Sequence, residues 1–357
     1  MPKLPIKKII GERQERCLYC SGTKIIKKGK RRKKFETLQL WYCKDCDTVF
    51  APRALKGKTY PIPVILDGLG YYHIGHSIQQ SAILLQERYG VRVTPTTLAR
   101  WLDEYKPFCT YARMREKGIA LFPPHRLIQA TRLHHQQVYH YRLHKAKLAL
   151  LLAEREHRAF TSLGTYLTNM ATACPHRFFT KDGRGSDLKT KFDIDGVSIA
   201  EKQNFATSIT QLAWQGALQN KQRHDSVQKF MLTSDSVTVA TEVPVFLYPK
   251  DIQHFKTELG FHVPLDNDAT ITGHIDVLQV RNGAIHILDY KPNAKREKPI
   301  EQLTFYALAL SRRTGLRLYD FKCAWFDDKH YFEFFPLHVV FKKPETHARG
   351  HGWRATA

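Results

Sequence analysis

Four cysteines near the start of the chain constrain its fold more than any other feature. They form two Cys-x2-Cys pairs, Cys17 with Cys20 and Cys43 with Cys46, and 22 residues separate the pairs. Cysteines at this spacing can reach one Zn²⁺ ion from two turns and close a tetrahedral site of four thiolates. Two disulfides would need an oxidising compartment, which nothing in the sequence indicates. We therefore expect a zinc ribbon over residues 14–50.

Basic residues concentrate beside these cysteines. The 357-residue chain has 56 Lys+Arg and 33 Asp+Glu, a formal net charge of +23. Residues 1–60 hold 17 of the basic and 5 of the acidic residues, whereas residues 161–357 hold 25 and 21. The densest run lies between the cysteine pairs: Lys27, Lys28, Lys30, Arg31, Arg32, Lys33 and Lys34. This excess favours a polyanion such as DNA as the partner, and a solvated basic face is the alternative.

The composition excludes several classes of protein. Hydrophobic residues make up 43% and aromatic residues 11% of the chain, which is enough apolar material for packed cores. The longest aliphatic stretch, residues 148–153, is far shorter than the roughly 18 residues of a membrane span. Residues 1–15 lack the apolar region of a signal peptide. We expect a cytoplasmic, nucleoid-associated protein of two or three domains, without a membrane partner.

Residues 60–106 have helical periodicity. Gly90 ends a first helix, and Thr94 and Pro95 are typical of the cap and first turn of a second. The second helix has one apolar face: Leu98, Trp101, Leu102 and Tyr105. Three polar residues then point outward: Thr96, Thr97 and Arg100. This pattern predicts a helix-turn-helix that binds DNA through those three residues, although other three-helix bundles share the periodicity.

The order and wording of these pieces resemble insertion-sequence transposases. The resemblance covers residues 14–106 and rests on the cysteine pairs, on Tyr-Tyr-His-Ile-Gly-His-Ser at residues 71–77, and on Thr-Pro-Thr-Thr-Leu-Ala-Arg-Trp-Leu at residues 94–102. It implies DNA binding at a defined sequence such as an element end, with a second copy or other mobile-element proteins as possible partners. The DDE-type catalytic domain of that family does not appear, so transposase chemistry is not implied.

Residues 107–158 are rich in Leu, Arg and His. His140 and His144 stand four apart, a spacing that can chelate a metal ion on a helix. No carboxylate follows at ligand spacing, so we favour a basic helical linker that joins two domains and lies along phosphates.

The C-terminal part, residues 159–342, alternates in the manner of β-strands. Residues 237–247, 271–278 and 284–291 are predicted strands, and Arg281-Asn282-Gly283 is a hairpin turn between the last two. A helix is expected over about residues 298–313, followed by strands near 316–326 and 330–336. The tail, residues 343–357, has little apolar material and is expected to be flexible.

Two carboxylates and a lysine meet on this predicted hairpin. Asp289 and Lys291 are two apart on one strand and share a face, and Asp276 can meet them from the other strand. Carboxylates hold Mg²⁺ or Mn²⁺, which polarises a phosphate and acidifies water, and an ammonium orients that water or stabilises developing charge. Singly, Asp-x-Lys is a frequent chance motif. The combination predicts hydrolysis of phosphodiesters.

Three motifs stand in the order of the RecB-type branch of PD-(D/E)XK nucleases, which includes the CRISPR-associated adaptation nucleases. They are Gly273-x2-Asp276, Asp289-Tyr290-Lys291 and Gln302-x3-Tyr306, and the resemblance covers roughly residues 160–336. It implies that Asp276, Asp289 and the Tyr290 carbonyl ligate the metal, and that Lys291 is the catalytic lysine.

The same resemblance implies further roles. Gln302 and Tyr306 would help to hold DNA, and His224 on an upstream helix would be a further metal ligand. Glu242 matches a glutamate often found on the preceding strand, although a solvent-facing strand residue would look the same. Cys174 is similar to a cysteine that binds an iron–sulfur cluster in some relatives. Only Cys323 follows Tyr306, so we expect no cluster here.

Together these features predict a multidomain α+β protein: a zinc ribbon, an all-α helix-turn-helix over residues 60–106, and a PD-(D/E)XK restriction-endonuclease-like domain. The predicted function is a DNA endonuclease with structural Zn²⁺ and catalytic Mg²⁺ or Mn²⁺, linked to a mobile element. Two alternatives remain. One is a regulator or element-end recognition protein that uses the nuclease fold without cleavage, and the other is a nuclease that processes DNA ends or single strands.

Overall fold

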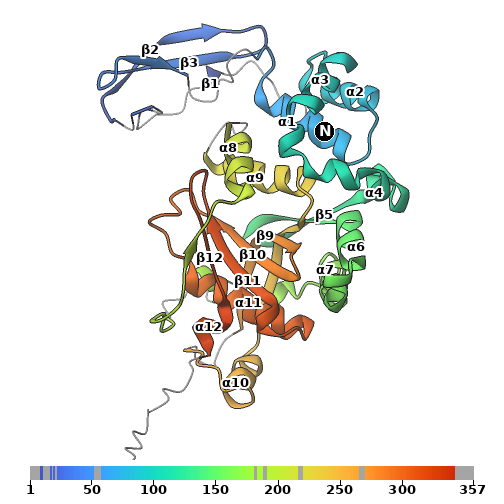
Figure 1. Ribbon diagram of the computed structural model, residues 1–357, viewed down its shortest axis with the longest axis vertical. Helices are drawn as coiled ribbons and strands as arrows, with labels where there is room; N and C mark the ends of the chain where they lie inside the picture. Colours follow the sequence, from blue (N-terminus) through green and yellow to red (C-terminus); the bar gives the residue numbers. More distant parts are fainter. Residues whose placement is uncertain are drawn as a thin grey trace, which may run out of the picture.

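The protein contains two separate β-sheets joined by helices (Figure 1). The computed structural model describes residues 9–10, 17, 19–20, 22–51, 58–180, 183–187, 191–215, 220–264 and 270–341. The predicted tail, residues 343–357, lies outside them. Within these ranges, no helix is long and apolar enough to cross a membrane.

The strands and α-helices have the following bounds. The strands are β1 (Ile9–Ile10), β2 (Ile25–Arg32), β3 (Thr37–Cys43), β4 (Thr48–Phe50), β5 (Ile128–His135), β6 (Gln137–His144), β7 (Ala200–Glu201), β8 (Thr238–Leu247), β9 (Ile271–Arg281), β10 (Ala284–Tyr290), β11 (Phe321–Phe326) and β12 (Tyr331–Phe334). The α-helices are α1 (Ile62–His73), α2 (Ile78–Tyr89), α3 (Pro95–Glu104), α4 (Arg115–Leu121), α5 (Pro124–Leu127), α6 (Lys145–Ala153), α7 (Thr161–Met170), α8 (Phe205–Gln215), α9 (Asn220–Ser234), α10 (Pro249–Thr257), α11 (Ile300–Thr314) and α12 (Pro336–Val340).

The larger sheet has the order β5-β6-β8-β9-β10-β11-β12-β7. Strands β10 and β11 pair in parallel, and helix α11 connects them. The other neighbouring strands in this sheet are antiparallel. The turn between β9 and β10 is formed by Asn282 and Gly283, both with positive φ (52° and 63°), as a two-residue hairpin requires. The predicted hairpin is therefore confirmed.

Two apolar cores form on the two faces of this sheet. Strand β10 is buried throughout and alternates between them: Ile285 and Ile287 pack in one core, and Leu288 and Tyr290 in the other. The first core includes residues of α6, α7 and α11. The second includes residues of α1, α3, α8 and α9. The strand ends that hold the carboxylates therefore lie between two packed helical layers.

Helix α2 ends at Gly90 and helix α3 begins after Thr94, as the sequence predicted. Ser77 caps α2 through a reciprocal bond with Gln80, and Gly90 ends it in the left-handed conformation. The Thr94 hydroxyl accepts a hydrogen bond from the Thr97 amide and caps α3. Helices α1 and α3 do not form a core of their own, because they share the second core with the sheet.

The middle segment differs from its prediction. Residues 128–144 form the hairpin β5–β6, which extends the sheet beside β8, and helical structure follows it in α6 and in the 3₁₀ helix Arg155–Phe160. His140 and His144 are therefore strand residues and do not share a helical face. The alternating burial of Leu133, Tyr141 and Leu143 against the core favours strands here. The expected basic helix over this part is wrong.

One buried histidine predicts how stability depends on pH. His73 on α1 is 1% exposed, and burial followed by the nearby Arg115 and Lys147 charges lowers its pKa to about 4. In the unfolded chain the pKa of this histidine is near 6.5. The contribution of neutral His73 to folding stability is therefore complete above that pH and is lost as the pH falls toward 4. We expect the titration of His73 to lower the free energy of unfolding at pH 5 by about 2 kcal/mol relative to neutral pH.

Urea midpoints at pH 7 and pH 5 test this expectation. The difference between the two midpoints should shrink in His73→Leu and stay unchanged in His125→Leu, whose histidine is exposed. An equal pH dependence in wild type and His73→Leu would contradict it.

Candidate active site

The hairpin β9–β10 brings two carboxylates together. Its ladder ends at the pair Leu288 and Val277, and the same register continued by one step sets Asp289 beside Asp276. Both positions lie at the buried end of the hairpin, where Asp289 is 3% exposed. The prediction that Asp276 meets Asp289 across this hairpin agrees with the geometry.

Two donors hold Asp276. His224 Nε2 lies 2.6 Å from its Oδ2, and the Tyr290 backbone N–H donates to the same oxygen at 3.0 Å. His224 comes from helix α9, which packs over the sheet from a position 52 residues earlier. The histidine expected from an upstream helix is therefore at the site.

Glu242 on β8 completes this group. Its Oε1 accepts a hydrogen bond from Gln228 Nε2 at 2.8 Å and lies 3.6 Å from His224 Nδ1. Ligand atoms of His224, Glu242 and Asp276 all lie within 4.8 Å of one another. Glu242 has a φ of 53°, a left-handed conformation that costs a glutamate on the order of 1 kcal/mol. Glu242 is 9% exposed, so it is not a solvent-facing strand residue, and its strained backbone favours a role at this site.

Lys291 lies on the other side of the carboxylate pair. Its Nζ is 2.9 Å from Asp289 Oδ2, and its backbone N–H donates to the Phe326 carbonyl at 2.9 Å. The second bond fixes the residue just beyond β10, so the ammonium stays beside the carboxylate. Its side chain is 22% exposed, which leaves it accessible from solvent.

Burial and mutual charge set the protonation of the cluster. Burial would lower the pKa of His224, but Asp276 raises it to about 9. Burial would raise the pKa of Asp276, but the His224 imidazolium lowers it to about 2. Burial and then the Asp276 charge raise the pKa of Glu242 to about 7 and that of Asp289 well above its usual range. Glu242 and Asp289 therefore keep protons more readily than free carboxyl groups, and a bound cation could take the place of those protons.

Gln302 and Tyr306 lie on helix α11 behind the hairpin. Gln302 Nε2 donates to Tyr306 Oη at 2.9 Å, and the Tyr306 ring fills the space where a side chain at Gly273 would stand, with a ring carbon 2.2 Å from that Cβ position. Tyr306 is 4% exposed. The structure thus corrects the expected DNA contact of Tyr306, whose ring supports β9, and leaves half-buried Gln302 as the polar group nearer the surface.

The order of strands and the cluster of two aspartates, a glutamate and a lysine can now be compared with known families. Residues 198–330 match the family model of the PD-(D/E)XK nuclease superfamily. The C-terminal half of the chain therefore contains a domain of this superfamily, whose members are usually nucleases or phosphodiesterases and typically use divalent metals. A nuclease domain implies DNA as its substrate. No curated protein and no solved structure matches the chain.

A second group of ligands lies in the N-terminal sheet. Sγ atoms of Cys17 and Cys46 are 3.6 Å apart, as are those of Cys20 and Cys43, and all four lie within 4.8 Å of one another. The backbone N–H groups of Tyr19 and Gly22 donate to the sulfurs of Cys17 and Cys20 respectively, each at 3.4 Å. The two pairs separated in sequence therefore converge, and the group could bind zinc.

The predicted basic residues of the hairpin β2–β3 differ in exposure and in contacts. Lys30, Arg31 and Arg32 are exposed on β2, and Lys34 is exposed in the turn. Lys33 differs, because its Nζ lies 3.3 Å from Glu36 Oε1 and donates to the Lys58 carbonyl. Lys33 is therefore partly engaged within the protein.

The polar residues of α3 are also divided. Thr96 and Arg100 are exposed. Thr97 is half-buried, and its hydroxyl lies 2.8 Å from that of the cap residue Thr94. Of the three residues predicted to face outward, Thr96 and Arg100 are therefore the two that do so.

Gln228 was missed by the sequence analysis, although it stands one helical turn after His224. We expect Gln228→Leu, which keeps the volume but removes the donor to Glu242, to weaken activation by Mg²⁺ about 10- to 100-fold. A Mg²⁺ titration of cleavage measures the shift, with Gln253→Leu on α10 as the matched control. An unchanged titration would show that the Gln228 bond does not position Glu242.

Proposed function

We propose that this protein is a DNA-binding, metal-dependent DNA endonuclease linked to a mobile genetic element. The observation that supports it best is the buried cluster on β8, β9, β10 and α9, in which two aspartates and a glutamate stand beside a lysine and a histidine. Hydrolysis of a phosphodiester needs both kinds of group, because negative oxygens hold a cation while positive groups stabilise the charge that develops on the phosphate.

The donor set fits a divalent cation. Asp276, Asp289, His224 and the carbonyl of Tyr290 would hold Mg²⁺ or Mn²⁺, and Glu242 stands where it can add a further oxygen. When bound, the ion would polarise the phosphate and acidify the attacking water. Without it, the protonated His224 lies between Asp276 and Glu242 and takes the place of the positive charge.

The chain's own groups would act on the phosphate in distinct ways. The Lys291 ammonium, held by Asp289, would orient the water or stabilise the phosphate oxygens as water attacks phosphorus and one ester P–O bond breaks. The released ester oxygen takes up a proton, so one product ends in a hydroxyl group and the other in a phosphate monoester. Tyr290 keeps Asp276 in place through its N–H, and Gln302 is available to a neighbouring phosphate.

The N-terminal half would dock the DNA. We propose that residues 14–50 are a zinc ribbon held by the four cysteines, and that α2 and α3 act as a helix-turn-helix in residues 60–106. Exposed cations on β2 suit phosphate contacts, and Thr96 and Arg100 suit contacts in a groove.

One ion-pair network links the two halves. Lys229 on α9 lies 2.6 Å from Asp67 on α1, and Arg88 on α2 lies 3.0 Å from the same carboxylate. Helix α9 also presents His224 to the active site. The helices proposed to hold DNA therefore rest on the same helix that supplies a metal ligand, which favours one continuous DNA path over two independent activities.

An incubation with Mg²⁺ and three substrates tests the proposal. Supercoiled DNA should be nicked or linearised, because an endonuclease needs no end. Cleavage confined to linear or single-stranded DNA would favour an end-processing nuclease. Binding without cleavage of any substrate, in Mg²⁺ or Mn²⁺, would favour a regulator or an element-end recognition protein.

A further inference from the structure

A second cluster of metal-ligand side chains lies beside the proposed active site. His135 ends strand β5, and Cys174 and His176 come from the segment before and within the short helix at His176–Phe178. Cys174 Sγ lies 3.9 Å from His135 Nε2, and His176 Nδ1 lies 2.8 Å from the same nitrogen. The three ligand atoms lie within 4.8 Å of one another. None of them takes part in the proposed hydrolysis.

His274 fixes the orientation of His135. His135 Nδ1 and His274 Nε2 are 2.8 Å apart, and the two residues are 5% and 9% exposed. The Phe179 ring stacks on His135 with centroids 3.9 Å apart and an interplanar angle of 13°. When Nδ1–H donates to His274, the lone pair of Nε2 faces Cys174 and His176. Histidine ligands of metal ions are oriented in this way by a partner on the other ring nitrogen.

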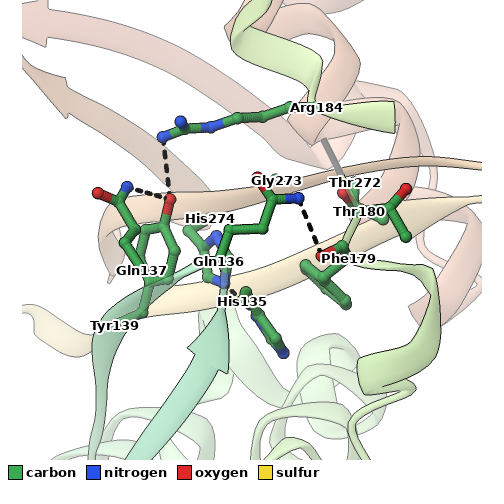
Figure 2. Close-up of a pocket in the computed structure, with 10 residues that line it drawn as sticks. All are labelled: His135, Gln136, Gln137, Tyr139, Phe179, Thr180, Arg184, Thr272, Gly273 and His274. Atoms are coloured by element: carbon green, nitrogen blue, oxygen red, sulfur yellow. Dashed lines mark hydrogen bonds between the residues drawn. The ribbon is translucent and has the colours of Figure 1, made fainter. Parts of the chain in front are cut away.

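The surroundings provide access to this cluster. Figure 2 shows His135, Phe179 and His274 among the residues around a cavity of about 200 Å³, with the Tyr139 ring against His274. The Arg184 guanidinium donates a hydrogen bond of 2.9 Å to the hydroxyl of Tyr139, at the other end of that side chain from its backbone. This cavity is lined by His135, and the exposed imidazole of His176 gives an ion a route to the cluster.

We propose that His135, Cys174 and His176 bind a second Zn²⁺ ion, separate from the four-cysteine group and from the catalytic cation. Two imidazoles and a thiolate suit a borderline-soft ion that prefers four ligands. In a tetrahedral site, two ligand nitrogens stand about 3.4 Å apart, and a nitrogen and a sulfur about 3.6 Å apart. The His176 nitrogen would therefore move outward by about 0.6 Å and the sulfur inward by about 0.3 Å.

His176 can make this adjustment because it is exposed, whereas His135 and Cys174 are buried. A water would supply the fourth ligand. On binding, the Cys174 thiol releases its proton to solvent, and His176 carries its hydrogen on Nε2 so that Nδ1 is free to ligate. Without the ion, hydrogen bonds join three imidazoles, from His176 through His135 to His274.

The ion would connect elements that are far apart in sequence. It would tie the end of β5 to the segment at Cys174, on the side where His274 stands two residues before Asp276 on β9. The site would therefore have a structural role: it would fix His135 against the segment at Cys174, and the hydrogen bond from His135 to His274 would link that position to β9, the strand that carries Asp276.

Zinc content of the full chain tests the proposal. The parent is the double variant Asp276→Ala, His224→Ala, which removes zinc from the active site, and metal is counted by native mass spectrometry after removal of excess zinc. The parent should retain two zinc ions per chain, and adding either Cys174→Ser or His176→Ala should reduce this to one. His134→Ala on the same strand and Cys323→Ala in the core are matched controls and should retain two.

A count of one in the parent, or two in both Cys174→Ser and His176→Ala, would overturn the proposal and leave a chain of hydrogen-bonded histidines only. The exposed His176 can be replaced with little risk to the fold, so this variant decides the matter even if Cys174→Ser is unstable. The test is independent of cleavage, and its failure would leave the proposed nuclease function unchanged.

Discussion

Lys291→Ala should slow cleavage by about 10²- to 10³-fold while leaving DNA affinity nearly unchanged. The ammonium lies 2.9 Å from Asp289 and, in the proposed mechanism, would face the reacting phosphate. Removing one preorganised charge of this kind lowers a rate by about 10²- to 10³-fold. Binding should be almost unaffected, because the chain retains a large excess of Lys and Arg elsewhere. Single-turnover cleavage and a binding titration in Ca²⁺ separate the two effects.

Lys295→Ala is the matched control for this variant. Lys295 is exposed four residues further along the same loop, so its loss removes the same charge without touching the carboxylates. It should cleave at the wild-type rate. Wild-type cleavage by Lys291→Ala would show that the active site lies elsewhere.

Cys43→Ser should release the N-terminal zinc ion and with it most of the DNA affinity. Cys43, the last residue of β3, is fully buried beside the other three cysteines. Zinc contributes about 10–16 kcal/mol to the folding of small zinc domains, so a small sheet without it is expected to unfold. The cations of β2 would then no longer be presented together. We expect one zinc ion fewer per chain and at least a tenfold weaker affinity for DNA, on the order of 1.4 kcal/mol.

The salt dependence of binding gives a second readout of Cys43→Ser. The slope of log affinity against log salt reports how many phosphate contacts are made, so it should become shallower in this variant. Cys109→Ser is the control, because Cys109 is buried outside the four-cysteine group. Unchanged affinity and slope after loss of the zinc would show that the N-terminal sheet does not dock DNA.

Local signals accounted for the parts of the fold that could be predicted. Asn282 and Gly283 favour positive φ, so they fixed the turn between β9 and β10 and with it the register of the hairpin. Thr94 and Gly90 set helix ends because a cap depends only on residues within one turn. In each case, the signal and the structure lie within a few residues of each other.

The hairpin β5–β6 shows where such signals fail. Its turn places Gln136 in the left-handed conformation, with a φ of 66°, and no glycine or Asn-Gly pair marks it. Leucine, arginine and histidine in this segment are compatible with a helix. The pairing of β6 with β8 stabilises strands in this segment, because Tyr141 and Leu143 become buried against the core of the main sheet.

The sequence by itself determined which residues of the hairpin can do chemistry. Asp289 and Lys291 share a strand, and Asp276 follows from a register that one tight turn sets, so short-range geometry brought these three together. The tertiary structure alone decided the rest. His224 reaches Asp276, Gln228 reaches Glu242, and Cys174 reaches His135 only because α9 and the segment at residues 174–176 pack against the sheet. Contacts across such separations depend on how whole faces bury their apolar residues, which spacing along the chain does not encode.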